Sequence, residues 1–223
     1  VAHYLAVSKN AGLPVHCIYF DFSRAFGRMD FGLLLGKLAG LGFGPRIIAW
    51  CASYLRDRRF SVAINATLSP PGSCTSGVVQ GSRIGPLLFS IYVCDLATSL
   101  RRLGVEYRFF ADDIKVFRCI RSRQDVLVLQ SAADIVHQWA LSNGMLIAGE
   151  KCATLHTDGS PVPYHLDGVP IPSVSSHRDL GVLFDRDLKF RSHSAKVARS
   201  IGVLSSLILR SFIVRNVPFF VKL

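Results

Sequence analysis

The sequence predicts an α+β domain with a largely antiparallel sheet flanked by helices. Strands and helices do not alternate regularly along the chain, as they would in a doubly wound parallel sheet. The one glycine-rich segment, residues 69–86, also lacks the GxGxxG and GxxxxGKS/T patterns of phosphate-binding loops. With 223 residues, half of them hydrophobic, the chain can bury one sizeable core.

Hydrophobic spacing and turn residues give the order of the elements. Pro45 marks a helix start, and Gly104 and Gly144 mark two helix ends. Trp50 and Trp139 have apolar neighbours at helical spacing and are expected in the core. The expected elements are a strand at 15–22, helices at 33–41 and 45–55, a strand at 60–68, a structured loop at 69–86, a helix at 87–103, strands at 107–111 and 114–118, a helix at 122–143, short strands at 152–157, 162–166 and 178–184, and a final helix from Ser192.

Asp112 and Asp113 separate two β-type runs and are the most informative residues. A two-residue hairpin turn normally contains Gly or Asn, so two adjacent acids are unusual there. Taken alone, the pair could be a solvated acidic turn. Asp21 ends another apolar strand, and three carboxylates would meet at one sheet edge if the strands are neighbours. Such a cluster is costly unless cations neutralise it, and oxygen ligands favour Mg²⁺ or Mn²⁺.

The charge balance favours a polyanionic partner. The 26 Lys and Arg residues exceed the 15 Asp and Glu residues and give a net charge of +11. Nucleic acid is therefore the first partner expected, and the alternative is a basic protein without such a partner. The arginines that could follow the phosphates of a duplex are at positions 56, 58, 59, 101, 102, 118, 121 and 123.

The six cysteines are scattered, and no histidine lies beside them at the spacing of a metal site. The sequence therefore predicts neither zinc nor a disulfide framework. Most of the cysteines lie in apolar runs, which favours reduced thiols and an intracellular location, in the nucleus or the cytoplasm. No membrane partner is expected, because Arg210, Arg215 and Lys222 interrupt the most apolar stretch, residues 201–223.

Several stretches occur in an order that is typical of one family. FDFSRAF around Asp21, VQGSRIGPLLFSIYVCDL from Val79 and FFADD at 109–113 are followed by WALSNGMLIAGEKC at 139–152 and HRDLGVLFDRDLKF at 177–190. In order and spacing they resemble the palm motifs of reverse transcriptases of non-LTR (LINE-type) retrotransposons. The chain begins with Val and ends within an apolar pattern, so it is interpreted as part of a longer protein.

The resemblance implies a right-hand polymerase fold and RNA-directed DNA synthesis. The partners would be an RNA template, a DNA primer and a dNTP. Two Mg²⁺ (or Mn²⁺) ions would act on the primer 3′-hydroxyl and the leaving pyrophosphate in an in-line phosphoryl transfer. The implied organisation is a remnant of the fingers at 1–14, a palm with the metal site at 15–157, a primer-grip region at 158–190 and a truncated start of the thumb at 191–223.

The same resemblance implies roles for individual residues. Asp21, Asp112 and Asp113 would bind the metal ions, and Phe22 would contribute its carbonyl oxygen. Lys151 would neutralise or protonate the pyrophosphate. The further implied residues are Phe22, Ser23, Arg24, Ala25, Phe26, Gln80 and Gly81 at the nucleotide, and Ser82, Phe110, Ala111, Leu180 and Gly181 at the template and primer.

Three positions depart from the family pattern. Gly27 stands where an aspartate is expected, Val79 replaces a proline, and Ala148 replaces an asparagine. They leave open a catalytically decayed palm that keeps only nucleic-acid binding, or a domain with a structural or interaction role. Phe26 matches the bulky residue that crowds a ribose 2′-hydroxyl and so argues against an RNA-dependent RNA polymerase. Ordinary packing is the alternative explanation of Phe26.

Overall fold

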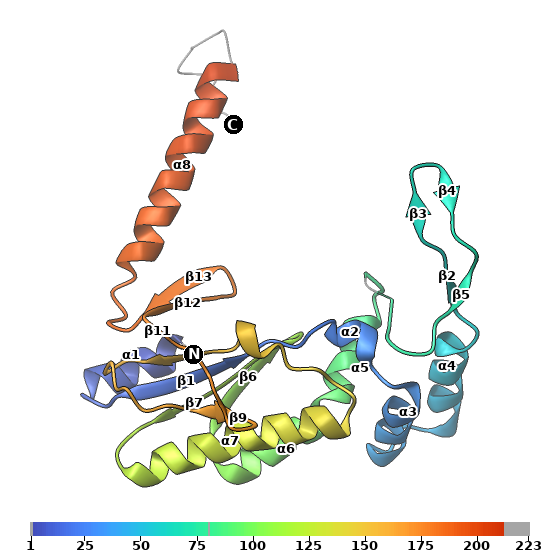
Figure 1. Cartoon of the computed structure of the whole chain (residues 1–223), viewed down its shortest axis with the longest axis horizontal. Helices are drawn as coiled ribbons and strands as arrows, with labels where there is room; N and C mark the ends of the chain where they lie inside the picture. Colours follow the sequence, from blue (N-terminus) through green and yellow to red (C-terminus); the bar gives the residue numbers. More distant parts are fainter. Residues whose placement is uncertain (1, 80, 212–223) are drawn as a thin grey trace.

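A five-stranded sheet forms the centre of the fold (Figure 1). The computed structural model describes residues 2–79 and 81–211. In spatial order, the strands are β11 (Ser173–Val174), β8 (Ala153–His156), β1 (Val15–Phe20), β7 (Asp113–Cys119) and β6 (Glu106–Phe110). Every neighbouring pair is antiparallel except β11 with β8, so the predicted α+β class and antiparallel sheet are confirmed.

Both faces of this sheet are covered (Figure 1). The covering elements are α6 (Cys94–Leu103) and α7 (Arg123–Ser142) on one face, and α1 (Ala2–Asn10) with the hairpin of β12 (Ser176–Asp179) and β13 (Val182–Asp185) on the other. All six residues of β1 are buried as a result. A strand buried on both faces has a nearly continuous apolar sequence, which explains the run VHCIYF.

The helix α7 begins and ends where the sequence predicts. Ser122 and Asp125 form a capping box at its start, and Gly144, with a φ of 64°, follows its end. Its buried face includes Leu129, Ala133, Val136 and Ala140, which recur at helical spacing. The local pattern and the tertiary packing therefore agree for this helix.

The remaining helices are α2 (Ala25–Arg28), α3 (Phe31–Gly40), α4 (Pro45–Leu55), α5 (Gly85–Tyr92), the 3-10 turn η1 (Gly149–Lys151) and α8 (Arg191–Ser211). Among them, α3, α4 and α8 match predicted ones, whereas α2 and η1 were not predicted. The single helix expected over 87–103 is instead divided at Val93 into α5 and α6. Asp95 Oδ1 accepts a hydrogen bond from the Leu96 N–H at the start of α6, and this local bond competes with a continuous helix.

Two stretches expected as single strands fold back into hairpins. Outside the sheet, the short strands pair as β2 (Arg59–Phe60) with β5 (Gly72–Ser73), β3 (Ala63–Ile64) with β4 (Thr67–Leu68), and β9 (His165–Leu166) with β10 (Val169–Pro170). The run at 60–68 reverses at Asn65, whose φ of 51° lies in the left-handed region that Asn tolerates. The run at 178–184 reverses at Leu180 and Gly181, with φ of 47° and 88°, so both single-strand predictions are wrong.

The two tryptophans have different surroundings. Trp139 is buried, and its Nε1 donates a hydrogen bond to Asp95 Oδ1 at 2.9 Å. Trp50 is 56% exposed, so its predicted place in the core is wrong. The helix α4 packs through Cys51 and Leu55, which leaves Trp50 on its outer side.

The cysteines are free thiols, and four of them, Cys17, Cys51, Cys119 and Cys152, are buried. The predicted burial of cysteines as small core residues is confirmed at these four positions. Across residues 2–79 and 81–211, no helix has the length and apolar character needed to cross a membrane.

The loop before α5 is fixed against α2 by backbone hydrogen bonds. The Gly77 N–H donates to the Met29 carbonyl at 2.8 Å, and the Val78 N–H donates to the Phe26 carbonyl at 2.9 Å. Gly77 has a φ of 79°, and a Cβ placed on it would lie 2.6 Å from the Cα of Gly27. Only glycine fits this close approach.

Gly77→Ala should therefore lower the free energy of unfolding by at least about 1 kcal/mol, from the positive φ and the backbone clash together. Urea denaturation monitored by circular dichroism measures the change. Gly36→Ala is the matched control, because Gly36 lies exposed within α3 with open space at its Cβ position. It should raise stability by about 0.5–1 kcal/mol. Equal effects of the two substitutions would contradict the proposed role of Gly77.

Candidate active site

The pairing of β1 with β7 brings two of the candidate carboxylates to one edge of the sheet. Phe20, the last residue of β1, lies opposite Ile114 in β7. Asp21 follows Phe20 and Asp113 precedes Ile114, so the two acids are at the same end of adjacent antiparallel strands. Both line one cavity of about 160 Å³. The condition set by the sequence, that these strands are neighbours, is met.

The turn between β6 and β7 consists of Ala111 and Asp112. Phe110 pairs with Asp113, so the second acid belongs to the strand, and its expected place within the turn is wrong by one residue. Ala111 has a φ of 51°, which costs an L-residue roughly 1–2 kcal/mol. A two-residue hairpin loop requires such positive φ values. The strained turn places Asp112 at the tip and Asp113 in the ladder next to β1.

The candidate carboxylates repel one another. The pKa of Asp113 is raised, first because its carboxyl is partly withdrawn from water, and then because Asp112, Asp21 and Asp179 are negatively charged nearby. The positive charge of Lys115 acts in the opposite direction. A bound cation would relieve this repulsion.

The backbone around Asp21 is held by the loop that follows α7. The Ala148 N–H donates to the Asp21 carbonyl at 2.9 Å, and the Ser23 N–H donates to the Leu146 carbonyl at 2.8 Å. Because the first bond uses a backbone donor, alanine at position 148 preserves it. Lys151 Nζ lies 3.6 Å from Asp21 Oδ1 on a side chain that is 61% exposed, so solvent screens this pair.

The β12–β13 hairpin is fixed to the sheet beside these acids. Lys115 of β7 and Asp179 of β12 form an ion pair in which both side chains are less than a tenth exposed. The ring of His177 stacks on Tyr19, with the ring centroids 3.8 Å apart. All four residues line the 160 Å³ cavity. The hairpin expected to hold a primer is thus attached to the two strands that position the carboxylates.

The candidate residues that follow Asp21 lead into α2. Ser23 is half-buried, Arg24 is exposed with a φ of 53°, and Ala25 is buried. The ring centroid of Phe26 lies 4.8 Å from that of Phe89 in α5. This contact agrees with the packing explanation of Phe26 and leaves its proposed effect on the ribose to experiment.

The nucleotide candidates Gln80 and Gly81, and the candidates at the template and primer, lie in the loop before α5 or at hairpin turns. Gly81 has a φ of 83°, and the Ser82 Oγ accepts a hydrogen bond at 3.1 Å from the first backbone N–H of α5. Gln80 lies outside the described residues. Phe110 and Leu180 are 60% and 52% exposed at the two hairpin turns, where neither contributes to the core.

The donor chemistry at this edge fits a hard divalent cation. Carboxylate oxygens are the ligands that Mg²⁺ prefers, and the pKa of Asp113 is raised first by its partial burial and then by the neighbouring carboxylates. The carboxylates are not gathered into a preformed ligand cluster: within residues 2–79 and 81–211, no three His, Cys, Asp or Glu side chains are placed together to hold a metal ion.

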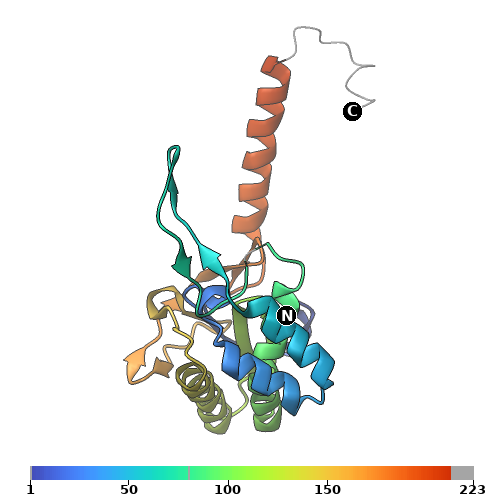
Figure 2. The same cartoon turned by 90° about the vertical axis from the view of Figure 1, so that its right-hand side faces the viewer.

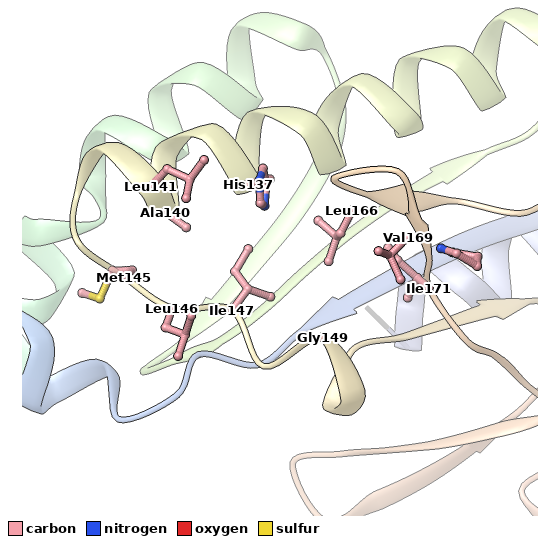
Figure 3. Close-up of a pocket in the computed structure, with 11 residues that line it drawn as sticks. His137, Ala140, Leu141, Met145, Leu146, Ile147, Gly149, Leu166, Val169 and Ile171 are labelled. Carbon is pink, nitrogen blue, oxygen red and sulfur yellow. The ribbon is translucent and has the colours of Figure 1, made fainter.

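A separate pocket of about 260 Å³ lies between the end of α7, the loop 145–149 and the β9–β10 hairpin (Figure 3). Its lining is mainly aliphatic, with His137 as its titratable side chain. Leu146 and Ile147 line it on the side of the loop that also binds the backbone near Asp21. The candidate carboxylates border the other cavity, so this pocket is set apart from the candidate chemistry.

The central sheet is largely antiparallel and carries acids from two neighbouring strands at one edge, with helices on one face and a hairpin on the other. This arrangement is the palm of a right-hand polymerase. Residues 5–196 match the family described as reverse transcriptase (RNA-dependent DNA polymerase), and the chain belongs to this family.

Individual relatives agree with this assignment. The chain is 34% identical over 205 residues to a probable RNA-directed DNA polymerase from transposon X-element of Drosophila melanogaster, covering 85% of this chain and 22% of that protein. It is 29% identical over 194 residues to the RNA-directed DNA polymerase from mobile element jockey of the same species, covering 82% and 21%. The chain thus spans about a fifth of the length of these relatives.

The fold has solved counterparts. The structure of apo telomerase from Candida tropicalis truncated from its C-terminal domain matches with a TM-score of 0.62 at 12% identity, over 85% of this chain and 38% of that chain. Telomerase from Candida albicans matches with a TM-score of 0.61 at 12% identity, over 84% and 32%. The predicted family and the right-hand polymerase fold are confirmed by these comparisons.

The sequence did not single out the Lys115–Asp179 pair or the His177–Tyr19 stack. The sequence does contain one signal of the ion pair. Lys115 interrupts the apolar run IKVFR, and a strand covered on both faces must bury the side chain at that position. A buried lysine requires a nearby acid, but the run does not identify which one.

Lys115→Met should lower the free energy of unfolding by about 3–5 kcal/mol, because it leaves the Asp179 carboxylate buried without its partner. The double variant Lys115→Met/Asp179→Leu should recover most of that loss, because it removes both charges. Urea denaturation of the single and double variants measures this coupling. If the double variant is as unstable as Lys115→Met alone, the ion pair does not join the hairpin to the sheet.

Proposed function

We propose that the chain is the catalytic palm of an RNA-directed DNA polymerase encoded by a non-LTR retrotransposon, and that it joins a dNTP to a primer 3′-hydroxyl on an RNA template. The observation that carries the proposal is the β1–β7 register, which brings Asp21 and Asp113 to the same sheet edge, next to Asp112 in the turn. Membership of the reverse transcriptase family supports it.

In this proposal, Asp21, Asp112 and Asp113 hold two Mg²⁺ or Mn²⁺ ions, with the Phe22 carbonyl as a further oxygen donor. When bound, the ions supply Lewis-acid activation of the 3′-hydroxyl and stabilisation of the pyrophosphate. Lys151 is exposed and 3.6 Å from Asp21, so it can move to a triphosphate without breaking a buried pair.

The β12–β13 hairpin orients the primer. Its anchoring through Lys115 and Asp179 supports this role, because a primer end in line with the α-phosphate needs a fixed surface beside the carboxylates.

Residues 1–14 would belong to the fingers, 15–157 to the palm, 158–190 to the primer-grip region and 191–223 to the thumb, of which 212–223 lie outside the described residues. RNA copying places the protein in the nucleus or the cytoplasm.

A decayed palm that only binds nucleic acid is the second candidate, and the departures from the family pattern favour it. Gly27 is the most telling, because a Cβ on Gly27 would meet no atom within 4 Å, so packing does not prevent an aspartate there. The lost carboxylate at position 27 therefore has no structural explanation. Primer extension decides between the two candidates.

Asp112→Asn should lower the rate of primer extension on an RNA template at least about a hundredfold, because it removes a negative charge where the cations act. The assay contains dNTP and Mg²⁺ and measures product length on a gel. Asp134→Asn is the matched control, since Asp134 is an exposed acid on α7 whose carboxylate binds Gln130. It should leave the rate unchanged.

Two results would contradict catalysis at this site. One is extension by Asp112→Asn at the rate of the unmodified chain. The other is the absence of extension by the unmodified chain while it still binds RNA, which would select the decayed palm.

A further inference from the structure

The outer side of α4 carries a stacked column of side chains. The rings of Trp50 and Tyr54 are nearly parallel, at 12°, with their centroids 5.8 Å apart. The guanidinium carbon of Arg58 lies 5.2 Å from the Tyr54 ring centroid, which continues the column past the end of the helix. Trp50, at 56% exposed, is open to solvent at the far end.

One guanidinium nitrogen of Arg58 has no acceptor among the described residues. Its Nη1 is shielded from solvent and has no hydrogen-bond partner within residues 2–79 and 81–211. Arg58 lines a hollow of about 350 Å³ together with the hydroxyl-bearing Ser73, Thr75 and Ser76. An unpaired guanidinium N–H that is shielded from water is costly. Because Arg58 lines the hollow, a change of its rotamer would let the guanidinium donate to an anionic oxygen there.

The surroundings of the column are positively charged. Arg46, Arg56 and Arg59 are exposed near it, against the single exposed acid Asp57 in the same stretch. The adjoining β3–β4 hairpin projects away from the body in both views (Figures 1 and 2). The column therefore lies on an open, basic face beside a protruding arm.

We propose that the α4 face, defined as Trp50, Tyr54, Arg58 and the hollow lined by Ser73, Thr75 and Ser76, binds single-stranded nucleic acid. Unstacked bases would stack on Trp50, and a backbone phosphate would accept hydrogen bonds from Arg58 in the hollow. Stacking on aromatic rings combined with basic side chains that follow the phosphates is how single strands are bound without sequence preference. In a duplex the base faces are already stacked on one another, so Trp50 selects the single strand.

This face is separate from the carboxylate edge and requires neither metal nor dNTP. The inference rests on one part of the proposed function, the nucleic-acid partner. The hollow also borders Val79, at the start of the segment whose next residues are candidates for nucleotide and template contact. A strand bound at Arg58 could therefore continue toward the active-site edge.

Binding of the chain to labelled single strands of about 12 nucleotides, measured by fluorescence anisotropy in EDTA without dNTP, tests the proposal. Trp50→Ala should weaken binding roughly 5- to 100-fold. Trp50→Phe, which keeps a ring, should retain most of the affinity. Leu127→Ala, an exposed apolar residue of α7, is the matched control and should have no effect. RNA and DNA strands of the same sequence are compared, and a duplex should be insensitive to Trp50→Ala.

Arg58 is tested by salt dependence. Arg58→Gln should weaken binding and make the slope of log affinity against log salt shallower by about 0.7, the value for one lost phosphate contact on a single strand. Arg58→Lys should retain the slope, because it retains the charge. Arg108→Gln removes an exposed charge from the edge strand β6, where Arg108 is already paired with Glu106, and should leave the slope unchanged.

Intrinsic fluorescence gives a direct readout. Trp139 is buried, so quenching by an oligonucleotide should come from Trp50 and should disappear in Trp50→Phe. Because Trp50 is exposed, its variants should keep the unfolding midpoint of the unmodified chain, which excludes misfolding as the cause of lost binding.

Three results would overturn the proposal. The first is a single-strand affinity that Trp50→Ala leaves unchanged, and the second is a duplex affinity that Trp50→Ala lowers as much as the single-strand affinity. The third is a change in the sedimentation of Trp50→Ala without a change in its oligonucleotide affinity, which would identify a protein-binding surface instead. Asp112→Asn should bind normally. A chain that binds single strands through Trp50 but extends no primer would thus support this inference and contradict catalysis. A chain that extends the primer but binds single strands independently of Trp50 would support catalysis and contradict this inference.

Discussion

The antiparallel register of β1 against β7 is the constraint on which the rest of the structure depends. Phe20 lies opposite Ile114, and this pairing determines both the position of Asp21 beside Asp113 and the face on which each apolar residue is buried. Side chains alternate between the faces of a strand, so a slip of one residue would exchange the side chains that face the two core clusters and would separate the acids. Core and candidate site are therefore specified by the same hydrogen-bond ladder.

The register is protected from both sides of the sheet. On one face, α7 packs Leu129 and Val136 against the same core cluster as Ile18 and Phe20. On the other face, Tyr19 stacks on His177. The strained Ala111 turn joins β6 to β7, and it is tolerated because the ladder between these strands and the pairing of β7 with β1 hold its two ends.

The parts that the sequence predicted are those encoded locally. The capping box at Ser122, the proline at the start of α4 and the glycine after α7 each act within a few residues, so their signals are legible in the chain. The candidate acids were recognised because their order along the chain is itself a pattern, although their side chains form no preformed ligand cluster in the described residues.

The parts that escaped prediction depend on contacts between distant residues. Lys115 and Asp179 are 64 positions apart, and the exposure of Trp50 depends on which side of α4 meets α3 and the core. Helical spacing shows that α4 has an apolar side. Trp50 has apolar neighbours along the chain, yet it lies on the outer side of the helix. The division at Val93 and the reversal at Asn65 were missed because each concerns the conformation of a single residue.

The buried Lys115–Asp179 pair has a consequence for how such a polymerase would move along its substrate. It attaches the β12–β13 hairpin directly to the strand that carries Asp113, so both belong to one rigid frame. Under the proposed function, the spacing between the primer surface and the reacting atoms would be constant from cycle to cycle. After each addition, the nucleic acid would have to slide forward by one nucleotide, while the protein frame stayed still.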